Sequence, residues 1–272
     1  MNCEICPRHC SLDEGQTGFC RARANVGGQI VCKNYGRLTA LALDPIEKKP
    51  LKRFHPGSYI LSAGSFGCNM RCPFCQNSDI SMADDRIPTV EYSPGQLVAK
   101  AVEMIPRGNI GLAYTYNEPL IGYEYVRDCA ALAREAGLVN VAVTNGMVCE
   151  APIDALLPLM DAMNIDLKAF SQAFYDLAGG NLETVKATIE RAVKACHVEV
   201  TTLVIPGLND TDTEMEAEAQ WLASLNPELP LHISRFFPRY HMTDRQPTPV
   251  ATVTRLRAVA DRYLRFVYTG NC

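Results

Sequence analysis

Three cysteines lie close together in the segment GCNMRCPFCQN, which covers residues 67 to 77. Cys68, Cys72 and Cys75 are separated by three and then two residues, and this segment has no fourth cysteine. A structural zinc site normally closes with four ligands, and a disulfide framework needs an even number of thiols. Three thiolates suit a 4Fe–4S cube in which one iron has no protein ligand. The spacing therefore favours an open iron–sulfur centre over zinc, and over cysteines that only pack as small apolar side chains.

Four more cysteines, Cys3, Cys6, Cys10 and Cys20, lie near the start of the chain. Four soft ligands over so short a span can close a tetrahedral zinc site or hold a second iron–sulfur cluster, and the spacing does not choose between the two metals. His9 is an alternative ligand in the same stretch. Few apolar residues accompany these cysteines, so a bound metal would add folding free energy. The competing interpretation is a set of free thiols in a flexible chain end.

The composition of the whole chain restricts the classes of function. The 272 residues carry a formal net charge of −4, and 47% of them are apolar, which is ordinary for a globular protein. This charge, and the lack of a stacking platform of aromatic and basic residues, predict no nucleic-acid partner. No run of 18 apolar residues and no signal peptide are present, so no membrane span is expected. Twelve cysteines without a secretion signal are typical of metal or redox chemistry in a reducing compartment, and we expect a cytoplasmic protein.

The chain divides by composition into two parts. Residues 1–57 are rich in cysteine, glycine and basic residues and are expected to form a small N-terminal region. Within it, residues 27–43 predict a hairpin of two strands that turns at Tyr35 and Gly36. Residues 58–272 are expected to form the main domain.

The main domain shows a regular alternation of apolar strands and helices. Six such units with nearly continuous apolar strands imply a parallel sheet covered by helices. An open or closed α/β barrel fits this pattern better than a doubly wound sheet, and we expect a partial (β/α)6 barrel with a cysteine-rich N-terminal extension. The strands are expected at 59–66, 109–116, 139–145, 162–168, 198–206 and 231–237, and the helices at 94–105, 119–136, 152–159, 182–195, 211–225 and 250–263.

Polar side chains fall where the predicted strands end. In barrel-like α/β folds, the carboxyl ends of the strands carry the active site. The residues concerned are Cys68 after the first strand, Glu118 after the second, Thr144 and Asn145 after the third, and Asp166 and Lys168 at the end of the fourth.

Several motifs together resemble a known family. The CxxxCxxC spacing followed by Gln-Asn is similar to that of the radical S-adenosylmethionine (SAM) enzymes. The segments DPIEKKPL, GCNMRCPFCQN, AYTYNEP, VTNG, IDLK and SRFFPRYHMTDRQPTP resemble the radical enzyme of the AmmeMemoRadiSam system, which is related to pyruvate formate-lyase activating enzymes. The resemblance runs over almost the whole chain and implies the fold of the radical SAM barrel.

The resemblance implies an oxidoreductase that uses a 4Fe–4S cluster and SAM. Reductive cleavage of SAM would give methionine and a 5′-deoxyadenosyl radical, which abstracts hydrogen from a protein or a small molecule; activation of a glycyl radical enzyme is one variant. The implied partners are an electron donor such as flavodoxin or ferredoxin and a protein substrate that docks on the open barrel. The alternative from a different class is a metal-binding regulatory or interaction module without turnover.

The resemblance also implies roles for single residues. Phe74 and Asn77 would lie beside the adenine, Glu118 would face the methionine ammonium group, and His241 would lie near the ribose. In place of the family's two glycines before the glutamate, this chain has Tyr116 and Asn117. The alternative for Glu118 is a structural role as an acid at a helix N-terminus.

Further roles follow from two other motifs. Thr144 and Asn145 match a Thr-Asn-Gly motif, although Val143 replaces the preceding aspartate. Lys168 would suit a carboxylate of the cofactor, and Asp166 an ammonium group or a ribose hydroxyl. The alternatives are a simple turn at Asn145 and a structural ion pair between Asp166 and Lys168.

Overall fold

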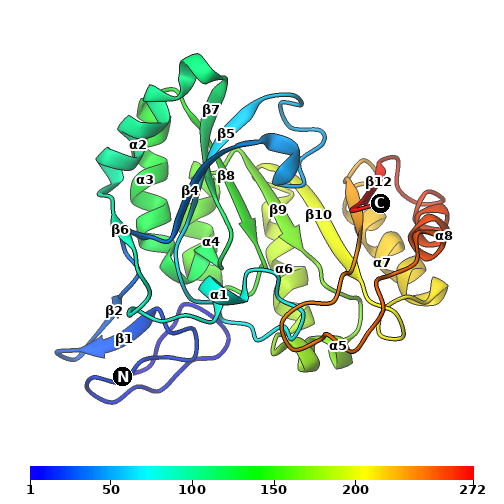
Figure 1. Cartoon of the computed structure of the whole chain (residues 1–272), viewed down its shortest axis with the longest axis horizontal. Coiled ribbons are helices and arrows are strands. Elements are labelled where there is room, and N and C mark those ends of the chain that lie inside the picture. The colour runs from blue at the N-terminus through cyan, green and yellow to red at the C-terminus, as the bar shows by residue number, and fades with distance from the viewer.

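The computed structural model describes all residues from 1 to 272, and its centre is a sheet of eight strands flanked by helices (Figure 1). The strand order is β12-β11-β10-β9-β8-β7-β5-β4. All neighbouring strands are parallel except β4, which runs antiparallel to β5 at one edge. These strands are β4 (Ala40–Pro45), β5 (Tyr59–Gly64), β7 (Asn109–Tyr114), β8 (Val139–Thr144), β9 (Ala162–Asp166), β10 (His197–Val204), β11 (Leu231–Arg235) and β12 (Val267–Gly270).

Helices follow the parallel strands, as the sequence predicts. Capping explains where several begin: Ser93 forms a capping box with Gln96 before α2, and Thr211 caps α7. The α-helices are α1 (Ser78–Ser81), α2 (Pro94–Glu103), α3 (Tyr123–Glu135), α4 (Glu150–Leu156), α5 (Gln172–Ala178), α6 (Leu182–Ala192), α7 (Asp212–Leu225) and α8 (Val250–Ala260), and the 3-10 helices are η1 (Ile46–Lys48), η2 (Ile105–Arg107), η3 (Pro119–Gly122) and η4 (Leu157–Leu159).

The partial (β/α)6 barrel is confirmed. The six predicted strands are β5, β7, β8, β9, β10 and β11, and each of the six predicted helices is present within a few residues of its expected ends. The sequence did not predict the short strand β12 or the short helices α1 and α5, and it assigned most of the edge strand β4 to a hairpin. The edge strands β4 and β12 do not pair with each other, so the barrel is open. No helix has both the length and the apolar character needed to span a membrane.

The predicted hairpin around Tyr35 and Gly36 is wrong. The hairpin strands are β1 (Arg23–Val26) and β2 (Gln29–Cys32), which pair across Gly27 and Gly28. Both glycines have positive φ, 61° and 72°, which the favoured two-residue hairpin turn requires. Beyond them, β3 (Arg37–Leu38) pairs with β6 (Val90–Glu91), and β4 joins the main sheet. The division of the chain at residue 57 stays a prediction, although the sheet itself extends across it.

The amino-terminal end of the barrel is closed. Ile46 and Leu51 are completely buried against strand residues in a small apolar cluster. The buried Glu199 carboxylate fixes this segment by accepting the backbone N–H groups of Lys52 and Arg53 at 2.9 and 2.7 Å. Burial opposes ionisation, but hydrogen bonds from His197 and other donors still lower the pKa of Glu199 to about 2. The closed end leaves the opposite end, toward which the arrowheads of β8 and β9 point in Figure 1, for a functional site.

Candidate active site

The loop that follows β5 carries the three clustered cysteines. Cys72 is buried, Cys68 and Cys75 are half-buried, and all three are free thiols. The backbone N–H of Cys75 donates to the carbonyl of Cys72 at 3.1 Å, which turns the loop. At Gly67, φ is 88° and a Cβ would lie 2.5 Å from the carbonyl oxygen of Cys20, so only glycine fits the start of the loop.

The three thiols share one environment. Burial is the main cause that raises the pKa of Cys72 to about 11, and the nearby Cys75 adds to it. Burial likewise raises the pKa of Cys68 well above its ordinary value, with smaller contributions from Glu118 and the other two cysteines. The unliganded thiols of Cys68 and Cys72 are therefore protonated at neutral pH, and binding of iron must displace their protons.

The donor set fits an iron–sulfur cube. No three Cys, His, Asp or Glu side chains of the chain are arranged around one point where a single metal ion would sit. A 4Fe–4S cube does not need such an arrangement, because each cysteine binds a different iron.

A buried carboxylate connects the ends of β7 and β8. Glu118, 3% exposed, accepts the Thr144 hydroxyl and the Asn145 backbone N–H, both at 2.7 Å. It also accepts the N–H of Leu120 and so caps η3, as the structural alternative for this residue proposed. Burial raises the pKa of Glu118 to about 7, against the opposing effect of these hydrogen bonds. The structure thus brings Glu118, Thr144 and Asn145 together.

Asn145 extends this network to the cysteine loop. Its side-chain amide donates to the Asn69 side chain at 2.9 Å and lies 3.6 Å from the Cys68 sulfur. The backbone N–H of Met70 is 3.4 Å from the same sulfur. Donors to a cysteine sulfur stabilise the thiolate and tune the potential of a bound cluster. The sequence reasoning missed Asn69, although its position between Cys68 and Cys72 was a usable signal.

Asp166 at the end of β9 and Lys168 two residues later lie beside the cysteine loop. Their side chains form an ion pair of 2.9 Å, so the structural alternative for this pair is also present. Burial alone would lower the pKa of Lys168, but Asp166 reverses the effect and raises it, so the lysine stays protonated. Both charges act on the thiol of Cys72, which places the pair beside the loop.

The remaining predicted residues surround the same loop. Phe74 is buried with its ring 5.7 Å from that of Phe174. The Asn77 amide donates to the carbonyl of Tyr116 at 2.7 Å. The backbone N–H of His241 donates to the carbonyl of Pro73 at 2.9 Å, while its side chain is exposed. The ligand roles of these residues stay predictions.

Tyr116 has a backbone conformation that glycine favours. Its φ is 73°, in the left-handed region that glycine favours. The Tyr116 hydroxyl donates to Asp44 at 2.5 Å, and Asp44 also pairs with the buried Lys49 at 2.8 Å. The sequence did not predict this link between the DPIEKKPL and TYNEP segments.

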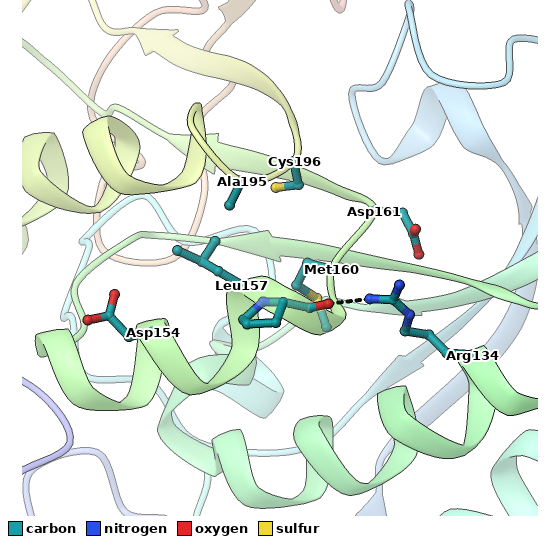
Figure 2. A pocket seen from close by; sticks show the side chains of 8 residues that line it. Arg134, Asp154, Leu157, Met160, Asp161, Ala195 and Cys196 are labelled. Carbon is teal, nitrogen blue, oxygen red and sulfur yellow. Dashed lines mark hydrogen bonds between the residues drawn. The ribbon is translucent and has the colours of Figure 1, made fainter.

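A separate cavity of about 470 Å³ lies away from these residues (Figure 2). Its lining residues precede β8, β9 and β10, at the amino-terminal ends of the strands. Arg134 crosses it to donate to the carbonyl of Pro158, as Figure 2 shows. This cavity is therefore not part of the site at the carboxyl ends.

Comparisons with known proteins agree with the geometry. Residues 64–220 match the profile of the Radical SAM superfamily. The chain is 41% identical, over its whole length and 81% of the relative, to an uncharacterized protein of Methanocaldococcus jannaschii. It is 30% identical to the pyruvate formate-lyase 1-activating enzyme of Escherichia coli K12, over 54% of this chain and 61% of that enzyme. The crystal structure of Streptococcus suis SuiB bound to SAM has a similar fold, with a TM-score of 0.61, 11% identity, and coverage of 78% of this chain and 52% of SuiB.

Proposed function

Because the chain belongs to the radical SAM superfamily and is a radical SAM enzyme that uses a 4Fe–4S cluster and SAM, we propose that Cys68, Cys72 and Cys75 hold that cluster. The observation that carries the proposal is that these thiols lie beside two polar groups at the carboxyl ends of the strands. One group is the Glu118–Asn145 network, and the other is the Asp166–Lys168 pair. When bound, the cluster reductively cleaves SAM, and the resulting 5′-deoxyadenosyl radical abstracts hydrogen from the substrate.

The residues of the chain orient SAM and keep water out. The Glu118 carboxylate accepts hydrogen bonds from Thr144, Asn145 and Leu120. It therefore fixes the loop after β8 beside the cluster. The same carboxylate would also contact the methionine ammonium group of SAM. Lys168 is protonated and offers its charge to the methionine carboxylate, while Asp166 balances that charge and remains near the ribose.

We place the adenosine on the cysteine loop. Phe74 supplies a buried aromatic surface for the adenine. Asn77, whose amide is bonded to the carbonyl of Tyr116, would lie beside the same base. His241 is kept near Pro73 by its backbone, and its exposed imidazole, which lies against the Tyr240 ring, would contact the ribose.

The substrate, on this proposal, is a protein or a small molecule that enters through the open side of the barrel. Phe237 and Tyr240 are both exposed on the segment that also carries His241, and they offer an apolar rim for docking. The motif resemblance supports a role in the AmmeMemoRadiSam system. The partial similarity to the E. coli activating enzyme supports a protein substrate and glycyl radical formation as one variant.

The electron donor we propose is a flavodoxin or a ferredoxin, and the compartment is the reducing cytoplasm. All twelve cysteines are free thiols in the structure, which suits that compartment.

Electron paramagnetic resonance (EPR) of the reduced protein tests the assignment of the site. Addition of SAM should change the cluster signal in the wild type. It should change the signal far less in Lys168→Met, whose cysteines are intact. An unchanged signal in the wild type would contradict SAM binding at this cluster.

Identification of the substrate uses purified candidates. Each protein of the AmmeMemoRadiSam system and a pyruvate formate-lyase would be added in deuterated form to the reduced enzyme with SAM. Deuterium in the 5′-deoxyadenosine identifies the hydrogen donor. Its absence with every protein would turn the search to small molecules.

A further inference from the structure

The four N-terminal cysteines lie in one place in the folded chain. They line a small cavity whose other walls include Arg8, Arg23 and Ile121. Cys3, Cys6 and Cys20 are buried, Cys10 is half-buried, and none is oxidised to a disulfide. Four thiols that converge on one cavity form a soft-ligand set of the size that a metal centre needs.

Two other possible ligands nearby are already engaged. His9 is exposed, and its Nδ1 pairs with Glu4 at 2.8 Å. The Cys32 thiol donates to the side-chain oxygen of Asn34 at 3.0 Å. A fifth free thiol, that of Cys149, is close to Cys3 and Cys6 but does not line the cavity. We therefore assign as ligands the four cysteines that line it, Cys3, Cys6, Cys10 and Cys20.

The surrounding backbone holds this set in shape. The N–H of Cys3 donates to the carbonyl of Cys10 at 3.0 Å, and the N–H of Leu12 donates to the carbonyl of Met1 at 2.8 Å. Little apolar surface supports these turns, since the core cluster to which Cys20 belongs contains only four buried residues, Cys20, Ala22, Phe66 and Ile121. A bound metal centre would stabilise such a segment substantially.

A direct contact joins the N-terminal set to the cluster loop. The backbone N–H of Cys68 donates to the carbonyl of Cys20 at 3.2 Å. A short run of covalent bonds and this one hydrogen bond therefore connects the sulfur of Cys20 with the sulfur of Cys68.

Two arginines reinforce the contact. Arg71 donates to the carbonyl of Cys68 at 2.8 Å and also to the carbonyl of Phe19. The guanidinium groups of Arg8 and Arg71 lie 3.5 and 3.9 Å from the centre of the Phe19 ring. They lie beside the two groups of cysteines together with Arg23, which is buried and paired with Glu124.

We propose that Cys3, Cys6, Cys10 and Cys20 hold a second iron–sulfur cluster that passes electrons to the SAM-binding cluster through the Cys20–Cys68 hydrogen bond. A structural zinc ion would explain the four thiols. Zinc does not change its oxidation state, however, so it would not explain the direct contact between Cys20 and Cys68.

The electron count of the relay is simple. A low-potential one-electron donor, such as a reduced flavodoxin or ferredoxin, reduces the N-terminal cluster by one electron. That cluster passes the electron to the second cluster, where SAM cleavage consumes it. This inference rests on the proposed function, because the relay needs a cluster at Cys68.

Metal content tests the site without disturbing it. Cys68→Ala/Cys72→Ala/Cys75→Ala removes the loop ligands and leaves all four N-terminal cysteines. After anaerobic iron–sulfur reconstitution, this variant should contain about four irons and four sulfides per chain, and the wild type about eight irons. Stoichiometric zinc in protein expressed in zinc-supplemented medium, or no metal in the triple variant, would overturn the proposal. These results do not depend on SAM cleavage, so they remain decisive if the proposed function fails.

Reduction kinetics test the relay. In a stopped-flow experiment with reduced flavodoxin, Cys6→Ser should slow reduction of the remaining cluster at least tenfold, and the control Cys272→Ser should not. The loop cluster must still be assembled in Cys6→Ser, with about four irons. Reduction at the wild-type rate in this variant would overturn the relay. If Cys6→Ser does not fold, a one-electron EPR titration of the triple variant decides instead, and a centre that cannot be reduced overturns the relay.

Discussion

The backbone N–H of Asn145 donates to the Glu118 carboxylate at 2.7 Å, while the side-chain amide of Asn145 lies 3.6 Å from the sulfur of Cys68. Asn145 thus connects the buried Glu118, 27 positions earlier in the chain, with Cys68, a proposed ligand of the cluster. Glu118 lies after β7 and Asn145 after β8, so the geometry depends on the pairing of these neighbouring parallel strands. The first three predictions concern this connection.

Glu118→Gln should slow SAM cleavage about tenfold to a hundredfold. The variant turns an NH2 group toward donors that need an acceptor, and hydrogen bonds to a charged group contribute about 1.5–3 kcal/mol. The rate of 5′-deoxyadenosine formation is the measurement. Glu216→Gln on α7 is the control, because its carboxylate contacts Arg262 and Tyr263 on the outside of the barrel and not the candidate site. A normal rate in Glu118→Gln with full cluster content would show that the network is not needed.

The stability of the cluster-free protein should depend on Glu118 in a defined pH window. Burial raises its pKa from 4.5 to about 7, so the folded state disfavours the ionised form. The stability associated with the protonated acid is complete below about pH 4.5 and is lost as the pH rises through about 7, by roughly 3 kcal/mol.

Urea unfolding of wild type and Glu118→Gln at pH 5 and pH 8 measures this effect. The difference between the two proteins isolates Glu118 from Glu218, whose burial also raises its pKa, to about 8. The wild type should lose stability relative to the variant at the higher pH. A constant difference would contradict a raised pKa at Glu118.

Asn145→Ala should make the reduction potential of the SAM-binding cluster more negative. The amide near the Cys68 sulfur stabilises the more negatively charged reduced cluster, and its loss removes that effect. An EPR-monitored redox titration measures the potential. Asn226→Ala, on an exposed turn, is the matched control. An unchanged or more positive potential in Asn145→Ala would contradict the assigned role.

Lys49→Met should destabilise the protein by about 3–5 kcal/mol, because it leaves the Asp44 carboxylate without its buried partner. Lys48→Met is a matched control on the neighbouring residue. Lys48 also faces Asp44, at 3.4 Å, but its side chain is 67% exposed, so its loss should cost at most about 1 kcal/mol. Equal effects in urea unfolding would show that Asp44 does not rely on Lys49.

Local sequence patterns predicted the elements of the barrel but not the contacts between them. The strands that became β5 and β7 to β11 are apolar almost throughout, and caps such as Ser93 mark helix starts, so both signals are local. Most of strand β4 was predicted as a hairpin strand, because its periodicity does not reveal that its antiparallel partner is β5.

The candidate site was predictable because it follows a rule of topology. Parallel strands deliver their carboxyl ends to one edge, so Cys68, Glu118 and Asn145 could be grouped from the sequence alone. The contacts of Cys20 with Cys68 and of Asp44 with Tyr116 join segments 48 and 72 residues apart. Nothing in either segment by itself signals its partner, and these contacts required the structure.

The central claim is that the loop from Cys68 to Cys75 carries a cluster that cleaves SAM. Its most direct test is to count 5′-deoxyadenosine formed per chain by the reconstituted, reduced protein with SAM, beside Cys72→Ala and Cys196→Ala. Cys196 lines the distant cavity and serves as the control thiol. We predict 5′-deoxyadenosine from the wild type and Cys196→Ala and none from Cys72→Ala. Equal formation by all three proteins, or none by a wild type whose cluster is intact and reduced, would contradict the account.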